Sequence, residues 1–420
     1  MTLRRKLGWV AVLYFAEGMP FGVVKELMPV YLRASGVDLT TIGLYSLVGL
    51  PWTFKFLWSP LIDRYGDRRT WTAACLLVLA AASAAMAPIA PTAAALVGAV
   101  MLVMAIASAT QDIAIDAYSI GLAESGEEGS INGVRVTAAR IALIASGGGL
   151  VLLSTMLGWP AVFVVAAAIF VLLAALVPFA PPVTTSEAAR RAWLQPLADW
   201  LARPGVVAVF GVVLLYKLGD AAMGPMVKPF WLDRGLTVGE VGVVSSTVGM
   251  LATIAGALAG GRLTDRWGIF RAMLILGLAQ AFSNLGYATA AWIDPPPPTT
   301  TVSSLAEAWA ALGEPARALI YSASMIESFT SGLGTAAFLS FLMNICDKEH
   351  AAVQYALLSA GFGLTREIAG AFSGFAVSSF GYATWFAFTV LLAFPALALL
   401  PWTRGWIREH GAGDRTAASG

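Results

Sequence analysis

The segment GGRLTDRWGIFR (residues 260–271) and its counterpart SPLIDRYGDRR (residues 59–69) decide the fold. Each follows an apolar run long enough to span a bilayer, and their aspartates, Asp63 and Asp265, lie 202 positions apart. The glycine lets a short loop turn, and an aspartate at a helix end can hold a helix of the other half. A single loop of this kind is equally consistent with a plain glycine turn flanked by basic residues that anchor the helix ends at the membrane surface. Two copies at corresponding places favour an internal repeat.

The composition indicates an integral membrane protein. Of the 420 residues, 58% are hydrophobic and 12% are charged, whereas a soluble domain carries about 25% charged residues. A helix rises about 1.5 Å per residue and the hydrocarbon core is roughly 30 Å thick, so about 20 apolar residues span it. Segments of that kind occur at 8–31, 40–61, 71–88, 94–121, 131–156, 160–179, 205–231, 240–261, 271–292, 316–342, 350–377 and 382–402. We therefore predict an all-α membrane protein with twelve spanning helices.

Loop lengths divide the chain into two halves. Most connections are short, but those at 180–204 and 293–315 are long, and the first has six spans on each side. We predict an N-terminal six-helix half (1–179), a linker (180–204), a C-terminal six-helix half (205–402) and a polar tail (403–420). Two pseudo-symmetric six-helix halves are typical of one class of secondary transporter.

The basic residues orient the chain, because cytoplasmic loops carry an excess of Lys and Arg. The loops on one side contain many basic residues, whereas those on the other contain Arg33, Arg234 and Arg317. This asymmetry predicts that both termini and the central linker are cytoplasmic.

Several charges lie inside the predicted spans. In LLYKLGDAAMG (214–224), Lys217 and Asp220 are near mid-span and three residues apart on one helical face. A charge at the bilayer centre costs on the order of 3 kcal/mol, so such residues face one another, a cavity or a substrate. Other mid-span charges predict a polar ring contributed by both halves: Glu17, Arg140, Glu327, Arg366 and Glu367. The three charges nearer the outer ends are expected to snorkel to the surface: Lys25, Glu26 and Lys228.

The fourth span contains SATQDIAIDAY (108–118), where Asp112 and Asp116 are one turn apart beside Gln111. Two buried carboxylates at that spacing repel, which favours the uptake and release of a proton. We predict proton coupling at Asp112 and Asp116, with Asp220 and Glu327 as second choices. The alternative is a structural cluster, in which the two aspartates pair permanently with basic residues of the spans: Lys55, Arg135 or Arg140.

Other kinds of site are not indicated. Cys75 and Cys346 lie within or at the end of apolar segments, and His350 and His410 lie outside them, so neither a disulfide framework nor a metal site is predicted. Phosphate-loop, dinucleotide and metalloprotease patterns do not occur in a suitable context. We expect no cofactor, no ATP-driven pump, no nucleic-acid partner and no enzyme.

Longer blocks resemble one family. SLVGLPWTFKFLWSPLIDRY (46–65), the block at 108–118, LLYKLGDA (214–221) and GEVGVVSSTVGMLATIAGALAGG (239–261) are similar to the AmpG family of muropeptide permeases, within the major facilitator superfamily. The resemblance extends from about residue 10 to about residue 400. It implies inner-membrane import of N-acetylglucosaminyl-anhydro-N-acetylmuramyl peptides from periplasm to cytoplasm together with protons, for cell-wall recycling.

The resemblance also suggests roles for the polar residues. Peptide carboxylates of such a substrate would bind basic side chains, its amine an acid, and its sugars aromatic faces and amides. The predicted substrate residues are Glu17, Gln111, Arg140, Tyr216, Lys217, Asp220, Gln280, Asn284, Glu327, Gln354 and Arg366. The predicted gating residues are Lys55, Asp63, Arg64, Asp265 and Arg266.

The sequence thus predicts a monomeric proton symporter that works by alternating access, with the lipid bilayer, protons and a muropeptide as partners. Two alternatives stay open. One is a superfamily transporter of another solute, such as an acetyl-coenzyme A-like molecule, a sugar or an exported drug. The other is an intramembrane enzyme, which would form product in detergent without a gradient.

Overall fold

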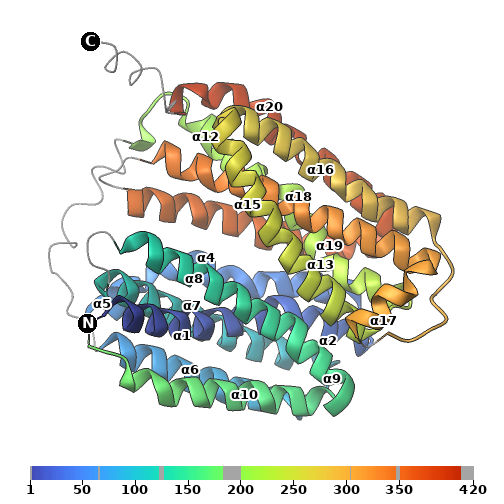
Figure 1. Ribbon diagram of the computed structural model, residues 1–420, viewed down its shortest axis with the longest axis horizontal. Helices are drawn as coiled ribbons and strands as arrows, with labels where there is room; N and C mark the ends of the chain where they lie inside the picture. Colours follow the sequence, from blue (N-terminus) through green and yellow to red (C-terminus); the bar gives the residue numbers. More distant parts are fainter. Residues whose placement is uncertain are drawn as a thin grey trace.

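The computed structural model describes residues 2–64, 67–122, 127–182, 200–302, 304–346 and 351–407. Within these ranges the chain is predominantly helical, and ten helices are long and apolar enough to cross a membrane. Figure 1 shows them packed lengthwise in two bundles, the N-terminal one blue to green and the C-terminal one yellow to red.

The N-terminal half consists of α1 (Leu3–Gly22), η1 (Val23–Leu27), α2 (Met28–Ala34), α3 (Leu39–Leu44), η2 (Tyr45–Gly49), α4 (Leu50–Phe54), η3 (Lys55–Leu57), α5 (Ser59–Arg64), α6 (Arg68–Met86), α7 (Ala94–Leu122), α8 (Glu128–Leu143), η4 (Ile144–Leu150), α9 (Val151–Leu157), α10 (Trp159–Leu176) and η5 (Val177–Phe179). Of the short η segments, η1 and η4 are π-helical and the others are 3₁₀.

The C-terminal half consists of α12 (Val206–Leu215), α13 (Leu218–Asp233), α14 (Val238–Glu240), η7 (Val241–Val248), α15 (Gly249–Trp267), α16 (Ile269–Ile293), α17 (Leu305–Ala310), η8 (Ala311–Gly313), α18 (Pro315–Ile345), α19 (Ala351–Leu391), α20 (Phe394–Leu399) and η9 (Leu400–Trp406). Here η7 is π-helical.

Two local features reconcile the ten long helices with the twelve spans predicted. The second span, 40–61, is interrupted by η2 and η3, and between them Pro51 has no N–H to donate to the carbonyl of Leu47. The last two spans are two helices that follow one another directly and are counted as one, separated at Gly381, whose φ of 79° is not helical. With these two features taken into account, the described residues give the predicted twelve-helix, all-α architecture.

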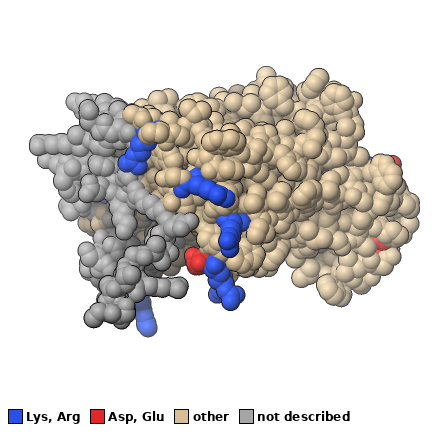
Figure 2. Space-filling model, turned by 90° about the horizontal axis from the view of Figure 1, so that it is seen from above, with Lys and Arg blue, Asp and Glu red and all other residues tan. Residues whose placement is uncertain are grey.

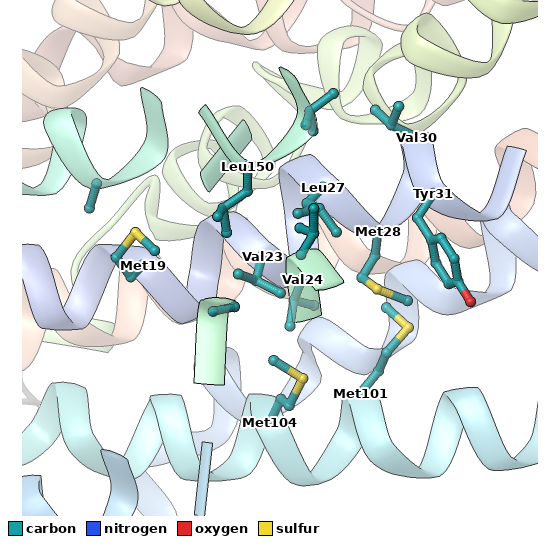
Figure 3. Packing of buried hydrophobic residues seen from close by; sticks show 14 of the residues in the cluster. Met19, Val23, Val24, Leu27, Met28, Val30, Tyr31, Met101, Met104 and Leu150 are labelled. Atoms are coloured by element: carbon teal, nitrogen blue, oxygen red, sulfur yellow. The ribbon is translucent and has the colours of Figure 1, made fainter. Parts of the chain in front are cut away.

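Within the N-terminal half the first span packs on α7. Met101 and Met104 of α7 lie beside Val24 and Met28 of the first span, and all four are buried (Figure 3). Leu150 of η4 covers the same span from the other side (Figure 3). The first span is therefore an interior element, which brings its polar residues toward the middle of the protein.

The two halves touch along particular pairs of spans. The main contacts join α2 to α13, join α3, η2 and α4 to α19, and join η4 to η7. Figure 1 places α2, α9 and α17 toward one end of the bundle, and the start of α1 at the other. On the face that Figure 2 shows, Lys and Arg gather toward the α1 end, and most of the remaining surface is uncharged. The halves are thus joined mainly toward the α17 end.

Candidate functional site

Three acidic residues meet inside the N-terminal half and form what we call the carboxylate cluster: Glu17 of α1 with Asp112 and Asp116 of α7. One oxygen from each lies within 4.8 Å of the other two. Lys55 enters from η3, where it makes an ion pair with Asp112 and its ammonium lies 3.9 Å from Asp116 Oδ2. The interrupted second span thus delivers a cation to the carboxylates.

Asp116 is held by further partners. Tyr14 Oη and Arg135 Nη2 each donate to Asp116 Oδ1 at 2.6 Å, and the Arg135 guanidinium lies 4.6 Å from the centre of the Tyr14 ring. By contrast, Glu17 Oε2 is buried without a hydrogen-bond partner among the described residues. The described cluster therefore combines three carboxylates with two cations, Lys55 and Arg135, and has one excess negative charge when all three carboxylates are ionised.

The two predictions for these aspartates are compatible. They do pair with Lys55 and Arg135, as the structural alternative expected, but the pairing leaves one carboxylate without a cation. Arg140 takes no part, because its Nη1 instead contacts the sulfur of Met250 at 3.3 Å. Gln111 is fully buried, and its two amide atoms have no hydrogen-bond partner among the described residues.

A second polar group, which we call the lysine cluster, lies within the C-terminal half. Lys217 sits at the break between α12 and α13, and it donates to Asp220 Oδ2 at 3.1 Å, Gln280 Oε1 at 2.8 Å and the Ser331 carbonyl at 3.3 Å. Asp220 also accepts from Gln280 Nε2 and, at 3.1 Å, from Ser331 Oγ. Lys217 is only 6% exposed, so its three protons are used within the protein rather than offered to a cavity.

Other predicted substrate residues are likewise engaged by the protein. Tyr216 donates to the Met273 carbonyl at 2.9 Å and stacks on Phe338. Asn284 is buried and donates to Thr389 Oγ1 at 3.0 Å. Gln354 is buried near the start of α19. Glu327 is half-buried, with its carboxylate 3.5 Å from the Ser328 hydroxyl.

A cavity of about 280 Å³ lies between the halves. Its charged lining comes from the first span, α13 and α19: Lys25, Glu26, Asp220, Lys228, Arg366 and Glu367. Of the predicted substrate residues, Asp220 and Arg366 line this cavity. Acidic and basic side chains from both halves thus line the same cavity.

Charged pairs join the halves around this cavity. Lys25 of the first span pairs with Glu367 of α19, whose other oxygen accepts from Arg366 at 2.9 Å. Glu26 pairs with Lys228 of α13. The expectation that Lys25, Glu26 and Lys228 snorkel to the surface was therefore wrong, because each finds an opposite charge on the other half.

A third such pair lies nearer the surface. Arg33 Nε donates to Asp233 Oδ1 at 2.5 Å, and Tyr382 Oη donates to Asp233 Oδ2 at 2.8 Å. The repeat itself contained a signal for two of these pairs. Glu26 and Lys228 are 202 positions apart and Arg33 and Asp233 are 200 apart, which is close to the offset between the repeated loops.

The predicted gating residues fall into three groups. Lys55 belongs to the carboxylate cluster rather than to a loop. Asp265 and Arg266, at the end of α15, are exposed and make no ion pair within the described part of the chain. The side chains of Asp63 and Arg64 lie outside the described residues.

Comparison with known proteins places the chain in a family. The model of the Major Facilitator Superfamily matches residues 10–318. The chain is 35% identical over 401 residues to the Anhydromuropeptide permease of Escherichia coli K12, covering 93% of this chain and 78% of that protein. It is 28% identical over 419 residues to Putative transporter AmpG 4 of Rickettsia felis, covering 93% and 94%.

A solved structure shares the fold. A bacterial homolog of the human lysosomal transporter Spinster, in an inward-facing and unoccupied conformation, matches with a TM-score of 0.76 at 12% identity, covering 97% of this chain and 99% of that one. At that identity the likeness shows the fold alone. Together, the family match and the identity to the permease show that the chain belongs to the AmpG family of muropeptide permeases within the major facilitator superfamily.

Proposed function

We propose that this protein is a proton-coupled symporter that imports anhydromuropeptides from the periplasm to the cytoplasm through the inner membrane, with both termini cytoplasmic. The observation that carries the proposal is the 35% identity, over 93% of the chain, to a protein named as an anhydromuropeptide permease. The charged cavity between the halves supports it, because a peptide with a free amine and carboxylates needs both acidic and basic partners.

The carboxylate cluster supports coupling to protons. Its excess negative charge can be neutralised by one proton on Glu17, Asp112 or Asp116. A neutral cluster is cheaper to enclose in the hydrocarbon region than a charged one. We propose that protonation of this cluster favours closure of the two halves around a loaded cavity, and that proton release to the cytoplasm completes the cycle.

The described arrangement fits an outward-closed state. The cross-half ion pairs lie on the side away from the basic loops, and Asp265 and Arg266 are disengaged. The cavity is also slightly smaller than the roughly 300–1,000 Å³ of typical ligand sites. We propose that the halves separate at the outer end to admit substrate, while the D-R-x-G loops latch the cytoplasmic end.

The test is uptake into proteoliposomes. Labelled anhydromuropeptide should accumulate when the interior is alkaline, and an ionophore that collapses the pH gradient should abolish accumulation. Free disaccharide, free peptide, a drug and a coenzyme A ester serve as competitors, which separates the muropeptide from other solutes. Detergent-solubilised protein should leave the substrate chemically unchanged, whereas conversion without a gradient would indicate an enzyme.

Two substitutions test the coupling site. Asp112→Asn and Asp116→Asn should each abolish gradient-driven accumulation, yet leave exchange of labelled for unlabelled substrate. Asp38→Asn is the matched control, because Asp38 caps α3 and lies outside the carboxylate cluster, and asparagine caps a helix equally well. If both cluster variants accumulate substrate like the Asp38→Asn control, the proton lies elsewhere.

A further inference from the structure

The cavity between the halves and the carboxylate cluster lie one helical turn apart on the first span. Phe21 lines the cavity, and Glu17, four positions earlier on α1, belongs to the cluster. Residues four positions apart share one helical face and are about 6 Å apart along the axis. A helical side chain also leans toward the N-terminus of its helix. The Phe21 side chain therefore leans from the cavity toward Glu17 and separates the two.

A second aromatic ring supports Phe21. The Trp52 ring meets the Phe21 ring edge to face, with 5.1 Å between the ring centres and 72° between the planes. Both side chains are half-buried. Trp52 belongs to α4 and lies three positions before Lys55, which pairs with Asp112 of the cluster. We call these two rings the aromatic partition, because they connect the wall of the cavity with the segment that carries Lys55.

Arg366 contacts the partition from the cavity. Its guanidinium carbon lies 5.8 Å from the centre of the Phe21 ring. Arg366 Nε and Nη2 donate to Glu367, which leaves further N–H groups of the guanidinium for a ligand. A contact between a guanidinium and a ring is weaker than a charge-assisted hydrogen bond to a carboxylate. A carboxylate that enters the cavity therefore draws Arg366 away from Phe21.

The two ends of the carboxylate cluster differ in exposure. Glu17 Oε2 is buried and has no hydrogen-bond donor among the described residues. The Asp116 side chain is 35% exposed, against 13% for Asp112. Because α7 runs toward the end where α1 begins, Asp116 lies one turn closer to that end than Asp112. The cluster thus has an unsatisfied acceptor on the cavity side and an exposed carboxylate toward the α1 end. Its other charged or titratable side chains are Lys55, Arg135 and Tyr14.

From these observations we propose that the aromatic partition is the proton barrier of the transporter. When a substrate anion draws Arg366 away, the Phe21 ring moves aside and water in the cavity gives a proton to Glu17. Asp116 later releases a proton toward the α1 end, so the cluster gains one positive charge and then loses it. While the partition is closed, protons do not cross without substrate. Such a role for Phe21 and Trp52 rests on the proposed proton-coupled import and explains how substrate and proton are linked.

The test measures proton entry into proteoliposomes that contain a pH-sensitive dye, after the outside is acidified. Without substrate, Phe21→Ala should admit protons about tenfold faster than wild type, which corresponds to a barrier lower by roughly 1.4 kcal/mol. Phe21→Leu keeps a bulky apolar side chain and should stay as tight as wild type. Phe15→Ala is the matched control, because Phe15 lies on the same helix, is likewise half-buried and does not line the cavity. Exchange of labelled for unlabelled anhydromuropeptide shows that each variant is folded.

A second arm asks where the protons enter. Phe21→Ala combined with Glu17→Gln removes the acceptor behind the barrier and should be as tight as wild type. Trp52→Ala removes the other ring, should leak like Phe21→Ala, and keeps the test decisive if Phe21→Ala does not fold. A leak that persists in the double variant would overturn the role of Glu17.

The wild-type protein separates failure of the barrier from failure of the proposed function. Added anhydromuropeptide should speed proton entry through wild type. If it does so while Phe21→Ala and Trp52→Ala stay as tight as Phe15→Ala, the aromatic partition is not the barrier, and proton coupling stands. If substrate never speeds proton entry through wild type, proton coupling itself fails.

Discussion

At the scale of single residues, the charge of Lys217 could serve either of two roles, pairing within the protein or binding substrate. Its position at mid-span predicted either a partner or a substrate. In the structure it is tied to Asp220, Gln280 and the Ser331 carbonyl, and it is almost fully buried. Its role in this arrangement is therefore to hold Asp220, which lines the cavity, in a fixed position.

Lys217→Met should lower the melting temperature of the protein clearly, because removal of one member of a buried pair leaves the other uncompensated, at a cost of about 3–5 kcal/mol. Lys217→Met combined with Asp220→Asn removes both charges and should recover much of that loss. Thermal unfolding in detergent measures both variants. If Lys217→Met melts like wild type but needs a higher substrate concentration for half-maximal uptake, the lysine binds substrate instead.

The partners of a buried charge could be predicted from the sequence only where they lie close to it along the chain. The cost of a charge in hydrocarbon was enough to place Lys217 and Asp220 facing inward, since they are three positions apart. Gln280 and Ser331, which complete the lysine cluster, are 63 and 114 positions from Lys217. No local pattern specifies such partners, because they depend on how α16 and α18 pack.

At the scale of elements, the π-helical segment η4 contacts two other π-helical segments, η1 and η7. Gly148 of η4 lies against Gly242 of η7, and a Cβ on Gly242 would be 3.0 Å from the Gly148 carbonyl. The Thr247 hydroxyl donates to the Gly242 carbonyl at 2.9 Å. Hydrophobic periodicity carries no trace of a π register, so the sequence did not predict this contact.

Gly242→Ala should therefore impair transport. The added methyl group meets the backbone of the other half at Gly148 and Leu152, and overpacking of this kind costs about 1–3 kcal/mol. We expect uptake to fall about tenfold with normal amounts of protein in the membrane. Gly261→Ala is the matched control, because nothing lies within 4 Å of its Cβ position. Equal uptake by the two variants would show that the π-helical contact is not part of the working cycle.

At the scale of the whole molecule, the repeat explains why ion pairs join the halves. When a pseudo-twofold axis relates two halves, residues near that axis face their counterparts. The charge patterns at 25–33 and 228–233 could thus have predicted Glu26–Lys228 and Arg33–Asp233. Lys25–Glu367 joins non-equivalent spans, so the repeat alone does not specify it.

These pairs should keep the outer end closed. Glu26→Lys puts two cations together where Glu26 and Lys228 now pair, so the outer end should open. Ser46 lines the cavity beside Lys25. In a protein with Cys75 and Cys346 replaced by alanine, Ser46→Cys should react with a membrane-impermeant maleimide from outside about tenfold faster when Glu26→Lys is present, which corresponds to about 1.4 kcal/mol.

Glu26→Lys combined with Lys228→Glu restores opposite charges at the same two positions and is the matched control. It should return labelling of Ser46→Cys most of the way to the wild-type rate. The return should be partial, because a lysine at position 26 also lies within electrostatic range of Arg140. If the single and double variants are labelled equally fast, the Glu26–Lys228 pair does not close the outer end, and closure must come from other contacts between the halves, such as the Lys25–Glu367 and Arg33–Asp233 pairs.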